Sequence, residues 1–385
     1  MKEKISNQLI SFNIVPPNPP NDGILFVDHS KKGRSGHLGH ALIEYKDEKI
    51  LAFYPNCSED NDGHSAVGWM EYKRSENGGQ TWSEPIVLEY SRNMFDEGKG
   101  CSTMSEKAVL APDGTIVLFN LVCDIQSAPK KYRNSTDISK YPMPNAFWEP
   151  HYIPTYIRSF DGGYTWTDAK NISDKRGRVF DALSHDDSIL ALQFCNDASE
   201  RWTGTTKEHV YSLFTSTDNG ETFYKKSELP FNTKDRGYGT MEVLSDGGII
   251  VYIYNINDEQ NLEYTISYDN GYTWAEPKTA YFEKKIRNPQ MVSINGCYFL
   301  HGRSGHFGEG SGNFVLYSSR DGILWDAGIY LRMQEAGHGA YSNNLVVGKY
   351  NSGKSNRLLI QASHAYEQHK TNIVHWWLEN ISIQK

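Results

Sequence analysis

Short apolar runs separated by turn residues recur along the chain from about residue 41 onward. The first unit holds runs at 41–45, 50–54, 67–72 and 86–88. Runs of this length with turn residues at their ends are typical of β-strands, and no long stretch carries the apolar period of a helix. Later units repeat the order, so the pattern predicts a series of antiparallel sheets of four strands.

One sequence motif, here called the box, returns five times along the chain. Its second copy reads SFDGGYTW, and the copies occupy residues 75–82, 159–166, 216–223, 267–274 and 318–325. Asp-Gly and Asn-Gly pairs supply the positive φ angles of a tight turn, and the acidic side chain can accept hydrogen bonds from its own loop. The aromatic residue can cover the adjoining hairpin. The serine-to-serine intervals of 84, 57, 51 and 51 residues predict a propeller.

The last unit lacks a box and a fourth strand. Its three runs lie at 341–347, 358–361 and 373–378, whereas the run at 24–28 near the N-terminus has no hairpin partner nearby. If this N-terminal run completes the last sheet, the ring closes and no sheet edge is left exposed. We therefore predict an all-β fold, a six-bladed β-propeller of four-stranded antiparallel blades, with seven blades as the alternative.

The predicted propeller is a single domain over residues 1–385 with two additions. Residues 1–22 form an N-terminal extension, because the segment near residues 14–20 is too rich in proline for a helix or a central strand. Residues 124–154 form an insertion in blade two, which explains the long first interval between boxes.

Composition and charge exclude several classes of function. Aromatic residues make up 13 % of the chain and the net charge is −8, with no basic block, which argues against nucleic acid as a partner. No stretch is apolar enough to insert into a membrane. The first residues lack the apolar core of a signal peptide, so the sequence as it stands predicts a cytoplasmic protein, or a secreted or periplasmic one if a leader has been removed.

Strand order locates the functional end of the ring. In a four-stranded antiparallel blade, the fourth-to-first and second-to-third connections lie at one end, and the boxes lie at the other. The axial pocket should therefore be lined by residues at the starts of inner strands and in second-to-third connections. The candidates at this end are His37, His40, His64, Trp148, Arg178, Trp202, Arg236, Arg287, Arg303 and His338. Trp148 and Trp202 are placed to stack on a sugar ring.

The boxes resemble the Asp-box (BNR) repeats of the sialidase superfamily, and they span nearly the whole chain. Gly339-Ala340-Tyr341-Ser342 resembles the segment that carries the nucleophilic tyrosine of sialidases, and Met241-Glu242 resembles the position of the glutamate that activates it. The resemblance implies that Tyr341 is a nucleophile and Glu242 its base, since a tyrosine has an unperturbed pKa near 10. It implies a blade-one general acid, for which His37, His40, His64 and Asp60 are the candidates. The residues alone also allow Glu242 simply to bind backbone N–H groups.

The arginine pattern of sialidases is not reproduced. Where sialidases carry their first arginine, in blade one, this chain has Gly36-His37-Leu38-Gly39-His40-Ala41. The arginine that sialidases carry in blade four is also missing after residues 249–254. Arg236, Arg287 and Arg303 could rebuild an anion site. The predicted substrate is therefore an acidic oligo- or polysaccharide, either sialic-acid-like or containing uronate.

Three functions stay open at this point. The first is a glycoside hydrolase. The second is a polysaccharide lyase, in which His37 or His40, Tyr341 and an arginine would carry out β-elimination. The third is a glycan-binding propeller without chemistry. No cofactor is required by any of them; a divalent metal stays open, because His37 and His40 are three residues apart but no HExxH motif is present.

Overall fold

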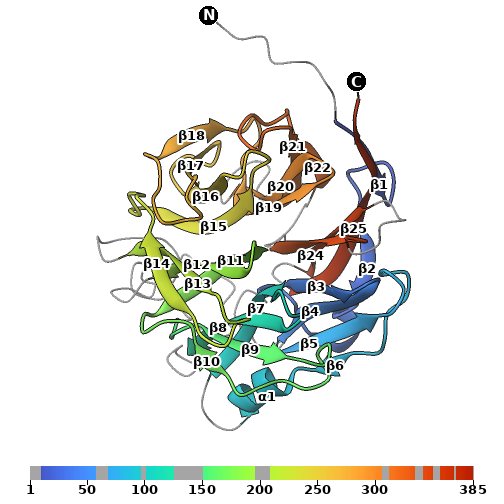
Figure 1. Cartoon of the computed structure of the whole chain (residues 1–385). Helices are drawn as coiled ribbons and strands as arrows, with labels where there is room; N and C mark the ends of the chain where they lie inside the picture. Colours follow the sequence, from blue (N-terminus) through green and yellow to red (C-terminus); the bar gives the residue numbers. More distant parts are fainter. Residues whose placement is uncertain are drawn as a thin grey trace, which may run out of the picture.

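Six antiparallel sheets follow one another around a common centre (Figure 1). The structure is a computed structural model, and it describes residues 10–57, 68–96, 101–124, 151–195, 209–305, 312–333, 341–349, 356–367 and 370–384. The prediction of a six-bladed propeller of four-stranded blades is confirmed. Most of the predicted insertion at 124–154 lies outside the described residues.

The first five blades share one strand order, in which the inner strand comes first and the box lies between the third and fourth strands. Blade one is β3 (Ala41–Lys46), β4 (Lys49–Cys57), β5 (Gly68–Ser75) and β6 (Ile86–Val87). Blade two is β7 (Cys101–Leu110), β8 (Ile116–Asp124), β9 (Thr155–Ser159) and β10 (Lys170–Asn171). Blade three is β11 (Gly177–His185), β12 (Ser188–Cys195), β13 (Val210–Ser216) and β14 (Tyr224–Glu228).

Blades four and five repeat this order. Blade four is β15 (Arg236–Val243), β16 (Ile249–Asn255), β17 (Asn261–Ser267) and β18 (Lys278–Tyr281). Blade five is β19 (Arg287–Ile294), β20 (Cys297–Ser304), β21 (Asn313–Ser319) and β22 (Ile329–Arg332). Helical segments in the described residues are short: η1 (Ser30–Lys32) and α1 (Glu89–Asp96), neither long enough to cross a membrane.

Blade six is built from both parts of the chain. Its strands β23 (Ser342–Val347), β24 (Arg357–Glu367) and β25 (Lys370–Ile383) come from the C-terminal region. The expected N-terminal strand, β2 (Ile24–Val27), pairs with β25 as predicted. Within the predicted extension over 1–22, β1 (Ile10–Val15) also pairs with β25 and adds a fifth strand to this blade.

The two N-terminal strands divide the long β25 between them. Ile24 lies opposite His375, whereas Val15 lies opposite Trp377 and Ile10 opposite Ile383. The β1 strand alternates, with Ile10, Phe12 and Ile14 packed against the core shared by blades five and six. The prolines that argued against a strand begin only after β1 ends.

Each box connects its blade to the preceding blade. In the blade-four box, Asp269 accepts hydrogen bonds from the Thr273 N–H at 2.8 Å and the Thr273 hydroxyl at 2.6 Å. Gly271 has φ +82° and lies so close to Leu213 of blade three that an added Cβ would be 2.3 Å from the Leu213 side chain. Trp274 donates to the Ser227 hydroxyl of blade three at 2.9 Å. The expected hydrogen bonds from the loop to the acidic side chain, and the positive φ of the glycine, are therefore confirmed. The absence of a side chain at Gly271 also lets the box pack closely against blade three.

The fifth box is one residue shorter than the sequence alignment of the boxes implied. Ser319, and not Ser318, donates to Asp321 at 3.0 Å and accepts from the Gly322 N–H at 2.9 Å. This serine precedes its glycine by only three positions, whereas Ser267 precedes Gly271 by four.

Polar side chains near the axis join the inner strands of neighbouring blades; we call this set the polar belt (Lys107, Asp181, Thr240, Glu242, His301 and Asn343). Lys107 of blade two pairs with Asp181 of blade three at 2.8 Å. Asp181 in turn accepts from the Met241 N–H of blade four at 2.9 Å. Asn343 of blade six donates to backbone carbonyls of His40 and Glu106 at 2.7 and 2.8 Å. The belt therefore sets the position of one inner strand relative to the next.

The pKa of Asp269 predicts a pH-dependent contribution of the box to stability. Hydrogen bonds from the Thr273 hydroxyl and N–H groups lower this pKa to about 2. Because the folded-state pKa is depressed, the stabilisation is present above the unfolded value near 4 and is lost as the pH falls toward 2. We expect Asp269→Ala to lower the melting temperature at neutral pH, with a difference from wild type that shrinks as the pH falls from about 4.

The first box supplies the matched control, because it carries Asn77 at this place and keeps the same contacts. Asn77 accepts from the Thr81 N–H and donates to the Thr81 hydroxyl, both at 2.9 Å. Asp269→Asn should therefore keep most of the stability, and its difference from Asp269→Ala should not change with pH. A pH-independent difference between wild type and Asp269→Ala would contradict the assignment.

Candidate active site at the propeller axis

The same distortion occurs in the inner strands of four consecutive blades. One extra residue enters the pairing with the second strand, between Ser105 and Lys107 in β7, Val179 and Asp181 in β11, Gly237 and Gly239 in β15, and Arg287 and Gln290 in β19. Such β-bulges redirect a side chain. The residues at these bulges, Glu106, Phe180, Tyr238 and Asn288, all line one small cavity at the axis.

Two of the bulge residues have strained backbones. Tyr238 has φ +47° and Asn288 has φ +54°, in the left-handed region that residues with a side chain rarely adopt. Gly302 makes room for the second bulge, since an added Cβ there would be 2.9 Å from the Asn288 carbonyl oxygen. Strain of this kind persists where the surrounding structure fixes it and is frequent at functional sites.

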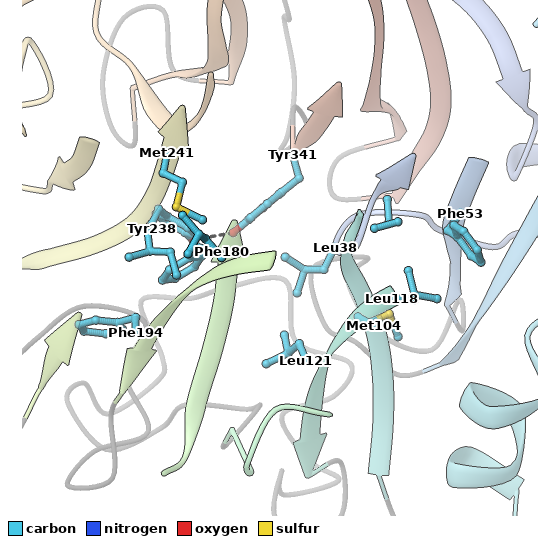
Figure 2. Packing of buried hydrophobic residues seen from close by; sticks show 14 of the residues in the cluster. Leu38, Phe53, Met104, Leu118, Leu121, Phe180, Phe194, Tyr238, Met241 and Tyr341 are labelled. Carbon is cyan, nitrogen blue, oxygen red and sulfur yellow. Dashed lines mark hydrogen bonds between the residues drawn. The ribbon is translucent and has the colours of Figure 1, made fainter. Parts of the chain in front are cut away.

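Tyr341 reaches across this cavity to Tyr238. The two hydroxyl oxygens lie 2.8 Å apart, and Figure 2 shows Tyr341 entering from blade six toward Tyr238, beside Phe180. Both tyrosines are buried. The cavity that they share with Glu106, Arg178 and other residues has a volume of about 30 Å³. That volume suits about one water molecule.

Three buried arginines surround the tyrosine pair and form what we call the arginine cage (Arg178, Arg287 and Arg303). The guanidinium carbons of Arg178 and Arg287 lie 5.7 and 5.6 Å from the Tyr238 ring centre. That of Arg303 lies 5.8 Å from the Tyr341 ring centre. Arg287 and Arg303 are direct cross-strand neighbours, so two like charges meet side by side. Burial, followed by repulsion from Arg287, lowers the pKa of Arg303 to about 10.

The pKa values of the two tyrosines are shifted in opposite directions. Burial opposes ionisation of Tyr238, but Arg287, Arg178 and the hydrogen bond from Tyr341 outweigh it and lower its pKa. Burial and the neighbouring Tyr238 raise the pKa of Tyr341. The first proton of the pair is therefore lost more readily than that of an ordinary tyrosine, and the second is held more strongly.

Glu106 pairs with Arg178 inside the same cavity. Its Oε2 atom accepts from Nε and Nη2 of Arg178 at 3.1 and 2.7 Å. Burial raises the pKa of Glu106, although Arg178 acts in the opposite direction. This pair brings together charges from blades two and three.

The two blade-one histidines occupy different positions. The His37 ring packs edge-on against Tyr341 with ring centres 4.6 Å apart. His40 lines the cavity, but Gln361 donates to its Nδ1 atom at 3.1 Å and its Nε2 atom lies 3.3 Å from the His37 carbonyl oxygen. Burial lowers the pKa of His40 to about 4. His40 is therefore neutral near pH 7, which argues against the predicted role of His40 as a general acid.

Glu242 does not lie beside Tyr341, contrary to the sequence-based expectation. Its two carboxylate oxygens accept from the N–H groups of Val243 at 2.8 Å and Ser293 at 2.7 Å. It lines a separate cavity of about 480 Å³ together with the later parts of the inner strands. Because Glu242 follows Tyr238 by four residues in one strand, about 13 Å separate the two positions. The simpler interpretation, that Glu242 binds backbone N–H groups, is the one observed.

Arg236 also differs from the expectation for an axial anion site. Its guanidinium binds the Glu263 carboxylate, with Nε at 3.0 Å, and the Asn255 side chain at 3.1 Å. These partners belong to blade four itself, so Arg236 is paired within its own blade. The other predicted arginines, Arg178, Arg287 and Arg303, do converge.

Five predicted site residues, Asp60, His64, Trp148, Trp202 and His338, lie outside the described residues. The same holds for connections that strand order predicts at the pocket end, at 58–67, 125–150, 196–208, 306–311 and 334–340. Among the described residues, no group of three or more His, Cys, Asp or Glu side chains is arranged to hold a metal ion.

Comparisons with known proteins agree with this architecture. No family model matches the chain, and no curated protein matches its sequence. A protein of unknown function from Dyadobacter fermentans superposes with a TM-score of 0.68 at 14 % identity, covering 95 % of this chain and 99 % of that chain. The NanB sialidase of Streptococcus pneumoniae superposes with a TM-score of 0.64 at 12 % identity, covering 95 % and 72 %. The intramolecular trans-sialidase of Ruminococcus gnavus gives 0.61 at 12 %, covering 92 % and 96 %.

The chain has the fold of the sialidase propellers. At these identities, the likeness concerns the fold and leaves the chemistry to be argued from the site. Within this sialidase-like fold, the sequence places Tyr238, Glu106 and Asn288 at the same end of the ring as Tyr341 and the three arginines of the cage, but it assigns them no role. Their only sequence signal is their place near the starts of inner strands.

Alkaline titration tests the division of acidity between the two tyrosines. We expect one tyrosine of the wild-type protein to ionise below the ordinary value near 10, as followed by the near-ultraviolet absorbance of phenolate. Tyr238→Phe should remove this early transition. Tyr252→Phe, which removes another buried tyrosine hydroxyl, should retain it. An early transition that survives in Tyr238→Phe would contradict the assignment.

The buried histidines predict acid sensitivity. Burial lowers the pKa values of His40 to about 4 and of His301 and His375 to about 3. Since the unfolded state binds protons near pH 6.5 and the folded state does not, stability is fully present above about 6.5 and is lost as the pH falls toward 4. We expect a loss of roughly 1–2 kcal/mol per such histidine by about pH 5, measured as a falling urea midpoint. Unchanged midpoints between about pH 7 and 5 would contradict this.

Proposed function

We propose that the protein is a carbohydrate-active enzyme that cleaves a glycosidic bond in an acidic glycan, acting as a hydrolase with Tyr341 as nucleophile. The observation that carries the proposal is the 2.8 Å contact between Tyr341 and Tyr238 inside the arginine cage. The sialidase-like fold adds support from an independent direction.

The arginine cage is suited to an anionic sugar. Arg287 and Arg303 are neighbouring buried cations at the axis, and guanidinium groups bind carboxylates through paired hydrogen bonds. A substrate carboxylate placed here would reduce the repulsion between them. Its reacting carbon would then be held near Tyr341, on which Arg303 also packs.

The tyrosine pair supplies the nucleophile. Tyr238, whose ionisation the cage favours, lies in hydrogen-bond contact with Tyr341 and takes up the Tyr341 proton as the Tyr341 oxygen attacks, since bond formation makes that proton acidic. The Tyr341 oxygen forms a bond to the anomeric carbon while the bond from that carbon to the leaving oxygen breaks, and the leaving oxygen takes up a proton. Water then cleaves the glycosyl–tyrosine bond: its hydroxyl goes to the sugar and its proton to the group that protonated the leaving oxygen. The Tyr341 oxygen takes its proton back from Tyr238, which restores the enzyme.

A polysaccharide lyase is the second candidate, and the position of His37 favours it. The His37 ring lies against Tyr341, so a histidine and a tyrosine stand together beside arginines that could neutralise a uronate. In that reaction, a base removes the proton next to the carboxylate and the leaving oxygen departs with formation of a carbon–carbon double bond. Ultraviolet absorbance of unsaturated uronates from uronate polymers would reveal it, whereas reducing ends without that absorbance indicate hydrolysis.

Turnover of chromogenic acidic glycosides tests the proposal. We expect release of 4-methylumbelliferone from the glycoside of N-acetylneuraminic acid or of a uronic acid, and not from neutral glucosides. Tyr341→Phe should lower kcat by about a hundredfold or more because the nucleophilic oxygen is lost.

Tyr252→Phe is the matched control for removing a buried hydroxyl. Tyr252 donates to the Gly322 carbonyl at 2.8 Å in the interblade packing of the fifth box. We expect this variant to lose about 1 kcal/mol of stability and to keep its activity. Equal activity of wild type and Tyr341→Phe, or turnover of neutral glycosides alone, would contradict the proposal.

A further inference from the structure

We propose that Glu106 is the group that gives a proton to the leaving oxygen in this reaction. The inference rests on the proposed function and adds a catalytic residue to the same site. Its basis is the position of Glu106, the different environments of its two carboxylate oxygens, and its mechanical connection to Tyr341.

The bulge in β7 places a carboxylate at the centre of the ring. The bulge residues Glu106, Phe180, Tyr238 and Asn288 come from four successive blades and line the cavity that Tyr341 also lines. In the described part of the chain, Glu106 is the only carboxylate residue that lines this cavity. Glycosidic cleavage needs an acid for a leaving oxygen of high basicity, and a carboxyl group can supply it.

The two oxygens of Glu106 are not equivalent. Oε2 accepts both hydrogen bonds from Arg178, which fix the plane and direction of the carboxyl group. Oε1 is buried and has no hydrogen-bond partner among the residues that the structure describes. A buried polar oxygen without a partner costs free energy, so its retention calls for a partner that arrives with the ligand.

Burial also favours the protonated form that an acid requires. Transfer of the carboxylate into the protein interior raises the pKa of Glu106, and the charge of Arg178 limits the rise. After the proton has left, the same arginine stabilises the carboxylate that remains. Arg178 therefore serves the second half of the proton transfer.

The polar belt fixes Glu106 relative to Tyr341. Asn343, two residues after Tyr341, donates to the backbone carbonyl of Glu106 at 2.8 Å and accepts from the neighbouring Lys107 at 3.2 Å. The buried side chain of Asn343 thus joins the strand that follows Tyr341 to the strand that carries Glu106. A precise relative position is what a reaction on two sides of one bond demands.

The proton inventory of the step closes. The Oε1 proton passes to the leaving oxygen as the glycosidic bond breaks, and Glu106 becomes a carboxylate. In the second step, Glu106 accepts a proton from the attacking water, which cleaves the glycosyl–Tyr341 bond. The sugar leaves with the hydroxyl, Glu106 is protonated again, and the Tyr341 oxygen takes its proton back from Tyr238.

Dependence on the leaving group tests this role. The probes are the 4-methylumbelliferyl glycoside that wild type hydrolyses and the methyl glycoside of the same acidic sugar. The aryl leaving group departs without protonation, whereas methanol does not. We expect Glu106→Gln to lower kcat/KM for the methyl glycoside by about a hundredfold and for the aryl glycoside by less than about tenfold.

Control variants separate this role from a structural one. Glu242→Gln changes a carboxylate in the other cavity and should affect both probes equally or not at all. If Glu106→Gln does not fold, Glu106→Asp carries the same comparison, because it retains a carboxyl group on a shorter side chain. Its methyl glycoside activity should fall more than its aryl glycoside activity.

The outcomes distinguish the two proposals. If wild type hydrolyses both probes and the Glu106 variants lose activity on both by the same factor, Glu106 only pairs with Arg178 and the inference is overturned, while the proposed function stands. If wild type hydrolyses neither these probes nor other acidic glycosides, the proposed function itself fails.

Discussion

The polar belt is the constraint on which the geometry of the axis depends. Asp181 accepts from the Thr240 hydroxyl at 2.7 Å as well as from backbone, and Thr240 in turn accepts from the Met291 N–H at 2.8 Å, which carries the linkage to blade five. His301 continues it to blade six through Ser342 at 3.0 Å. Hydrogen bonds restrict direction as well as distance, so blades joined in this way cannot slide along the axis past one another. Apolar packing between blades alone would tolerate more displacement.

A fixed axis allows costly groups to be buried there. Arg178, Arg287 and Arg303 are each less than a tenth exposed, and a buried cation is expensive unless charges or dipoles surround it. Arg178 is matched by Glu106, and the tyrosine pair offers a charge that the cage itself stabilises. The strained backbones of Tyr238 and Asn288 add to the cost. Buried charges and strained backbones both lower the stability of the fold. Their occurrence together is expected at a functional site.

The sequence predicts the scaffold well because the boxes are local. Turn, serine, acidic residue and aromatic residue are all within eight positions, and their hydrogen bonds form inside one hairpin, so the spacing of the boxes reveals five of the six blades. The site depends on features that are not local. A bulge inserts one residue and turns every following side chain to the other face, and no pattern of residues marks where it occurs.

Arg236 and Arg287 illustrate the limit, because both are the first residue of an inner strand. Arg236 is captured by Glu263 two strands away, whereas Arg287 turns to the axis and meets Tyr238. Glu242 shows the same limit in another form: the fourth inner strand begins at Arg236, so Glu242 falls in the later half of the strand, away from the axial end. The position of each of these side chains depends on the partners that the fold brings near it, and residue type alone does not predict those partners.

Closure of the ring by β1 and β2 bears on the order in which the residues at the propeller axis are synthesised and brought together. Pairing of residues 10–15 and 24–27 with β25 joins segments more than three hundred positions apart, so this contact forms late and slowly. The arginines of blades three and five are made before Tyr341, and the blade that carries Tyr341 is completed only when β25 meets the two waiting N-terminal strands. During synthesis, the residues of the arginine cage are therefore made before Tyr341, which lies in the blade that β1 and β2 complete.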